Sequence, residues 1–222
     1  MRVLLAILMS SSLMMGLTPR VHASTSQQSQ VDINLVPSDD DSAVDPVDPQ
    51  DSSQPYPGDT ADDGLTSGTG SRDQLSLDFL SNLTFKPITA SRGPVTTTAA
   101  NSRAMIQITD RRGTGAGWTL QVTPSALTNT SQALTATIDL GSVTIKSAGT
   151  NVSRTPRLVN QGHLTVGSVN NVLVADKNAG VGTWLLLLNQ GTEPTTLTIH
   201  DQQLTAGSYS GELTWSLTNA PS

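Results

Sequence analysis

The residues of this sequence best suited to binding chemistry are its three tryptophans, each of which lies two residues before a leucine. The three pairs are Trp118–Leu120, Trp184–Leu186 and Trp215–Leu217. Positions i and i+2 of a β-strand share one face of a sheet, so each pair would place an indole beside an isobutyl group. Aromatic faces can stack on the C–H faces of sugars, which makes the pairs candidate glycan contacts. The same spacing also fits core positions, which we favour because few other aromatics are present to fill a core.

Two arginines, Arg111 and Arg112, precede a glycine-rich segment, Gly113–Gly117, that leads into the first tryptophan motif. On an exposed turn, their guanidinium groups could pair with carboxylates or phosphates of a ligand. A solvated turn that binds nothing is the slightly favoured interpretation. A phosphate-binding glycine loop is not indicated, because the segment leads into a strand pattern and not into a helix.

Catalytic and metal-binding constellations are weak in this sequence. The histidines beyond the N-terminal segment are His163 and His200, and His200 is followed by Asp201. A His–Asp pair that is adjacent in sequence needs a third group, placed in space, before it can act as a triad. Two histidines without any cysteine make a poor zinc site. The sequence therefore predicts a protein that is not an enzyme and that carries no metal or cofactor.

Alternating apolar residues from Leu75 onward predict short β-strands separated by turns, and these strands would position the tryptophan motifs. The clearest alternation covers residues 134–140. Continuous apolar runs at 172–175 and 184–188 are typical of strands buried on both faces, which makes Trp184 a core residue. The predicted fold class is all-β, an antiparallel β-sandwich of the immunoglobulin-like type, with a disordered acidic N-terminal linker.

The first 74 residues differ in composition from the rest of the chain. A basic start and an apolar run, followed by Ala23 and Ser24, predict a secretory signal peptide over residues 1–23 that is cleaved between these two residues. Residues 24–74 are rich in Asp, Ser and Pro, with Arg72 as the only basic residue, which predicts a disordered acidic linker. No later apolar run is long enough to span a membrane, so no transmembrane segment is expected in the mature chain.

The surroundings of two tryptophan motifs resemble those of a known family. The segments Asp110–Leu120 and Tyr209–Leu217 are similar, in order and spacing, to the two signatures of the WxL domain. The resemblance covers residues 75–222, and Arg112 departs from it because a hydroxyl residue is more usual there. It implies a cell-wall-binding β domain that attaches non-covalently to peptidoglycan of Gram-positive bacteria. It also implies, as partners, a membrane-anchored WxL-interacting protein and sortase-anchored surface proteins.

We therefore expect a secreted protein of the cell wall and cell surface that binds peptidoglycan through residues 75–222. The alternative is a protein-interaction subunit that docks on the membrane-anchored WxL-interacting partner, so that its retention on the wall is indirect. Nucleic acid is not an expected partner, because no basic stripe is present. The candidate binding residues are Trp118, Leu120, Tyr209, Trp215, Leu217, Arg111 and Arg112.

Overall fold

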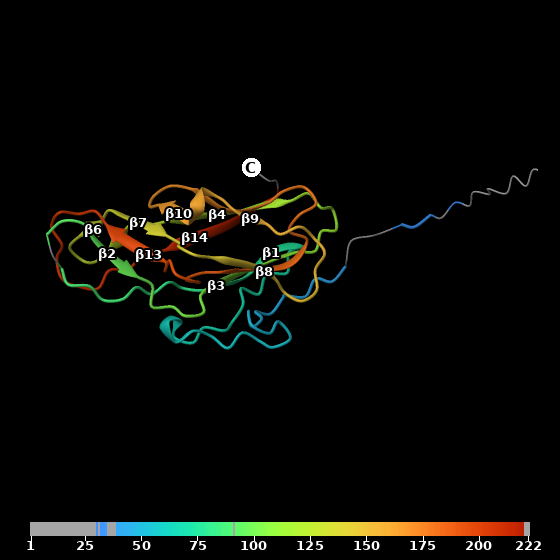
Figure 1. The fold of residues 1–222 in the computed structure, drawn as a ribbon, viewed down its shortest axis with the longest axis horizontal. Helices are drawn as coiled ribbons and strands as arrows, with labels where there is room; N and C mark the ends of the chain where they lie inside the picture. The colour runs from blue at the N-terminus through green and yellow to red at the C-terminus, as the bar shows by residue number, and fades with distance from the viewer. Residues whose placement is uncertain (1–29, 31, 35–38, 91, 220–222) are drawn as a thin grey trace, which may run out of the picture. The chain divides into compact units, whose positions relative to one another are not determined.

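The computed structural model describes residues 30, 32–34, 39–90 and 92–219 (Figure 1). The predicted signal peptide over residues 1–23, with its cleavage site at Ala23 and Ser24, lies outside the described residues. The chain divides into two compact units, Met1–Leu35 and Val36–Ser222, and the fold below is that of the second unit. No helix among the described residues is long and apolar enough to cross a membrane.

The second unit is built from short antiparallel β-strands, which confirms the predicted all-β class. Two single-turn 3-10 helices, η1 (Thr60–Asp62) and η2 (Asn160–Gly162), interrupt them. The strands are β1 (Leu75–Leu80), β2 (Val95–Thr98), β3 (Met105–Asp110), β4 (Trp118–Pro124), β5 (Leu127–Thr128), β6 (Ala133–Leu134), β7 (Ala136–Asp139), β8 (Thr144–Ser147), β9 (Arg157–Leu158), β10 (His163–Thr165), β11 (Asn170–Ala175), β12 (Gly182–Leu187), β13 (Thr196–Ile199) and β14 (Leu213–Thr218).

The strands form three four-stranded sheets, with the orders β1-β3-β12-β8, β14-β4-β11-β9 and β10-β7-β13-β2, and a small β5-β6 hairpin. Neighbours within these sheets are mostly distant in sequence, as β4 and β14 are. One hydrophobic core draws on the inward faces of all three sheets. Alternation of apolar residues along β4, β7 and β13 supplies one inward side chain at every second position. The three sheets are therefore held together by a single shared interior.

Strand β12 is buried on both faces, as the continuous apolar run at 184–188 predicts, and its neighbour β3 is buried on both faces as well. On the face away from the shared core, a second hydrophobic cluster contains Phe79, Met105, Leu185 and Leu187. Tyr56 completes this cluster, with its ring centroid 4.8 Å from that of Phe79. The cover over this face is an N-terminal segment that we call the strap, residues 45–69.

The strap corrects the expectation of disorder throughout residues 24–74, because its polar groups are paired with the β domain. The Tyr56 hydroxyl donates to the Arg103 carbonyl at 3.0 Å, and Asp59 Oδ2 accepts the backbone N–H groups of Ser102 and Arg103 at 2.8 and 2.6 Å. In the same way, Asp62 Oδ2 accepts the backbone N–H of Asn82 at 2.9 Å. Composition suggested a solvated acidic spacer, but these aspartates are hydrogen-bond acceptors for backbone groups. The folded region therefore begins well before Leu75.

A buried carboxylate lies beneath the strap. Asp78 Oδ1 accepts a hydrogen bond from Ser76 Oγ at 2.5 Å, and its Oδ2 accepts from Thr109 Oγ1 at 2.6 Å and Gln107 Nε2 at 3.2 Å. The Gln107 Oε1 in turn accepts the backbone N–H of Val47 in the strap at 3.0 Å. Burial raises the pKa of Asp78 above the ordinary aspartate value of 3.8, although these hydrogen bonds partly offset it. Asp78 is thus linked to the strap through Gln107, and its burial disfavours the charged carboxylate.

The variant Asp78→Asn is expected to flatten the dependence of the unfolding free energy on pH. Because the pKa is higher in the folded than in the unfolded protein, the contribution of Asp78 to stability is complete below the unfolded pKa and is lost as pH rises through the folded pKa. Urea unfolding measured from about pH 4 to about pH 7 tests this linkage, with the exposed Asp63→Asn as control. Equal slopes for wild type and Asp78→Asn would contradict it.

Candidate functional site

The first tryptophan motif lies in the interior of the protein. Trp118 and Leu120 are both 0% exposed, and the Trp118 indole Nε1 donates to the Gly180 carbonyl at 3.0 Å. The turn before Trp118 depends on Gly117, which has a φ of +81° and whose added Cβ would lie 2.3 Å from the Ala175 carbonyl oxygen. Both side chains therefore lie in the core, the position that the sequence favours for Trp118, and a ligand would have to open the core to touch either of them. A contact of Trp118 or Leu120 with a ligand stays a prediction.

The other two motifs face the same core. In the register of β14 with β4, Leu217 is paired with Leu120 and Trp215 with Val122. Trp215 and Leu217 are half-buried because β14 is the edge strand of its sheet. Trp184 on β12 is 3% exposed, as predicted, and donates from Nε1 to the Val181 carbonyl at 3.0 Å. The W-x-L spacing is thus, in all three places, a way to pack an indole and a leucine into one interior.

The two candidate arginines are engaged within the protein. Arg112 donates from Nε and from one terminal nitrogen to the Asp110 carboxylate at 2.9 and 2.8 Å, and to the Gly117 carbonyl at 2.8 Å. The hydrogen bonds to the Asp110 carboxylate, together with its negative charge, raise the pKa of the Arg112 guanidinium. Arg111 is largely buried and lies 3.6 Å from the Asp40 carboxylate. Arg112 therefore fixes the turn before β4 and is not available for a ligand in this arrangement.

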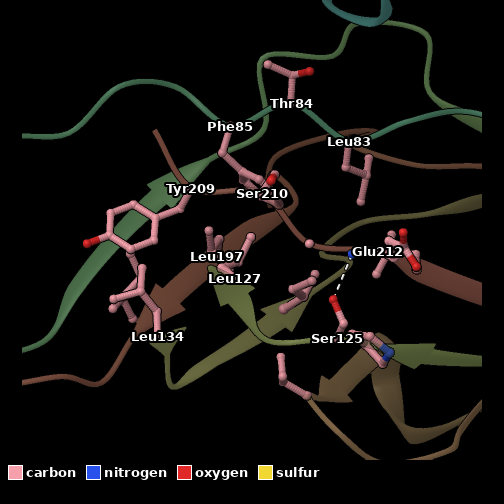
Figure 2. Close-up of a pocket in the computed structure, with 16 residues that line it drawn as sticks. Leu83, Thr84, Phe85, Ser125, Leu127, Leu134, Leu197, Tyr209, Ser210 and Glu212 are labelled. Atoms are coloured by element: carbon pink, nitrogen blue, oxygen red, sulfur yellow. Dashed lines mark hydrogen bonds between the residues drawn. The ribbon is translucent and has the colours of Figure 1, made fainter. Parts of the chain in front are cut away.

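A pocket of about 370 Å³ lies at the start of the second signature (Figure 2). One wall is the segment Tyr209–Leu213, which leads into β14. The floor is apolar and comes from the β5-β6 hairpin and from strands β7 and β13, while the connection between β1 and β2 supplies Leu83 and Phe85. The floor side chains are Leu127, Leu134, Ile138, Leu197 and Ile199. Of the predicted site residues, Tyr209 is the one that lines this pocket.

Polar groups fix the second-signature wall of the pocket. Ser125 Oγ accepts the backbone N–H of Glu212 at 2.8 Å (Figure 2), and the Ser125 N–H donates to the Glu212 carbonyl at 2.8 Å. The Tyr209 hydroxyl lies 3.0 Å from Gln132 Oε1 and 2.9 Å from the Thr205 carbonyl. The backbone of Ser210 exchanges two hydrogen bonds with Thr128, at 2.8 and 3.0 Å. The position of this wall is therefore fixed by hydrogen bonds of its backbone.

Residues 22–221 match the family model described as WxL domain surface cell wall-binding. The chain belongs to the WxL domain family. No curated protein and no solved structure matches it. As a WxL domain, it belongs to a family of surface proteins that bind the cell wall and not to a family of enzymes.

Other polar constellations of this WxL domain are weaker than the pocket. His163 Nδ1 lies 2.6 Å from Asp139 Oδ1, but both side chains are about half exposed and are simply cross-strand neighbours of β10 and β7. His200 Nε2 lies 3.1 Å from Thr137 Oγ1, so the two histidines have separate partners. In the part of the chain that the structure describes, no cluster of three or more His, Cys, Asp or Glu side chains could hold a metal ion.

Sequence reasoning missed most of the pocket of this WxL domain. Phe85, Ser125 and Glu212 line it, and none of the three was a candidate. Glu212 offered the one available signal, because it is a charged residue between Tyr209 and Trp215 in the second signature. Phe85 carried no signal, since it comes from a distant connection that only the tertiary fold brings to the pocket.

Proposed function

We propose that this WxL domain attaches the protein to the cell surface by binding peptidoglycan in the pocket beside its second signature. The apolar floor and hydroxyl-bearing rim suit an amphipathic ligand that presents methyl groups beside amides and hydroxyls. Peptidoglycan offers these groups in its acetyl, lactyl and alanyl units. The residues that line the pocket include no lysine or arginine, which argues against an anionic wall polymer as the ligand.

The candidate residues of the second signature take different roles in this proposal. Tyr209 lines the pocket with a half-buried ring and is the proposed contact. Trp215 and Leu217 pack against the core from β14 and hold the wall that Tyr209 and Glu212 present. Their contribution to binding is therefore support of the pocket wall.

Filling the pocket should abolish retention on the wall. Ser210 is exposed, lines the pocket and is held at its backbone by Thr128, so Ser210→Trp is expected to occlude the pocket in a folded protein. The chain from Ser24, mixed with purified peptidoglycan sacculi and centrifuged, should bind at least roughly tenfold more weakly as this variant. The amount of protein in the pellet, measured over a range of sacculus concentrations, gives the affinity.

A matched control lies on the neighbouring strand. Ser216 is exposed on β14 and points away from the core, since Trp215 and Leu217 point toward it. Ser216→Trp should therefore pellet as wild type does. The opposite result, with Ser216→Trp lost and Ser210→Trp retained, would assign binding to the outward polar face of β14 and β4. Wild-type protein that stays in the supernatant would refute direct binding to peptidoglycan.

One structural feature favours the alternative function of docking on a membrane-anchored WxL-interacting protein. Strand β14 pairs with β4 and forms the edge of its sheet, and edge strands can accept a strand from a partner. Under this function the protein would bind the partner's ectodomain, or sortase-anchored surface proteins, but not bare sacculi. The sedimentation experiment separates the two functions directly.

A further inference from the structure

Glu212 is the one charged residue that lines the pocket. Ser125 forms hydrogen bonds with both the backbone N–H and the carbonyl of Glu212, which fixes the position of the Glu212 Cα. Among the described residues, its carboxylate has no hydrogen-bond or ion-pair partner. A positioned, unpaired carboxylate in a pocket without bases creates a local preference for a cation.

The position of Glu212 relative to the apolar side chains restricts the shape of that cation. In Figure 2, Tyr209 and Glu212 lie at opposite ends of the group of lining residues, with Leu127 and Leu197 between them. A ligand that fills the pocket and reaches Glu212 must therefore present an alkyl segment to the floor and a positive charge at one end. A compact inorganic cation would leave the apolar floor uncovered.

Because the proposed ligand is peptidoglycan, this inference rests on the proposed function. We infer that the pocket binds the aliphatic side chain of a stem-peptide diamino acid and that Glu212 pairs with its free terminal ammonium. Peptidoglycan crosslinks are amides formed on that amine, so a crosslinked side chain no longer carries the charge. The domain would then prefer uncrosslinked peptides over crosslinked ones. Such a preference would concentrate the protein on regions of the wall whose stem peptides are not yet crosslinked.

Chemical blocking of the amines tests this preference. Sacculi are divided, and one half is treated with acetic anhydride so that free amines become neutral amides. Wild-type protein should bind the acetylated sacculi roughly two- to fivefold more weakly, which is the range expected for one exposed ion pair added to a larger contact. Glu212→Gln should bind untreated sacculi with this same reduced affinity and should show no further loss after acetylation.

The control Glu193→Gln removes the same charge from an exposed loop outside the pocket and should respond to acetylation as wild type does. Equal binding of wild type to both preparations, or unaltered binding by Glu212→Gln, would overturn the ammonium assignment while leaving peptidoglycan binding intact. Equal losses in Glu193→Gln and Glu212→Gln would overturn it as well, since they would indicate net charge alone. Failure of wild type to pellet with either preparation would instead refute the proposed function.

Discussion

Replacement of Trp118 by alanine is expected to lower the free energy of unfolding by about 3–5 kcal/mol, the range for removal of a fully buried large aromatic side chain. Trp118 is 0% exposed and packs in the core shared by the three main sheets. Its removal also leaves the Gly180 carbonyl without the indole N–H that it accepts at 3.0 Å. Urea unfolding followed by far-UV circular dichroism measures the loss without relying on tryptophan fluorescence.

The half-buried Trp215 provides the comparison for this variant. Because β14 is an edge strand, Trp215→Ala should cost less, about 1–2 kcal/mol. Trp118→Ala protein that is still folded should bind sacculi normally, since the indole does not reach the surface. A variant with wild-type stability and lost wall binding would show instead that Trp118 meets the ligand. The two tryptophans of the family signatures thus differ in how much stability each provides.

The strand pattern could be predicted from sequence because it depends on local alternation. Leu134, Ile138 and Leu140 are buried as their period of two requires, and Trp184 lies in the core. The pairing of β14 with β4 could not be predicted, because it joins segments almost a hundred residues apart and no local signal encodes it. The pocket could not be predicted either, for the same reason. Its walls come from the connection after β1, the β5-β6 hairpin and the segment before β14, which are far apart in the sequence.

The arginines show a different limit of sequence reasoning. The glycine-rich segment that follows Arg112 predicts an exposed turn for this residue. The carboxylate that binds it, Asp110, lies only two residues away in the same signature. What the sequence does not reveal is that Asp110 is 1% exposed, so that its charge requires a partner within the protein. Burial of the carboxylate, and not the type of turn, decides where the guanidinium lies.

The strap gives the second large expected effect. Tyr56→Ala should lower the free energy of unfolding by about 3–4 kcal/mol, because a buried aromatic ring is removed from the cluster on the outer face of β3 and β12. Tyr56→Phe removes the hydroxyl that donates to the Arg103 carbonyl and should cost about 1 kcal/mol. A freely moving acidic linker would give no loss in either variant. Urea unfolding of the two variants beside wild type therefore separates an integral strap from a detachable spacer.

Loss of the strap should also change the surface of the folded protein. A chain that begins at Leu75 would expose Phe79, Met105, Leu185 and Leu187 on one sheet face. An apolar patch of this kind promotes association, so the shortened chain should bind hydrophobic dyes and self-associate where the longer chain does not. Light scattering and dye fluorescence of the two chains at equal concentration test this expectation. A chain from Leu75 that stays monomeric and does not bind the dye would contradict this expectation. Such a result would show that the outer face of the sheet can be uncovered without exposing an apolar patch that promotes association.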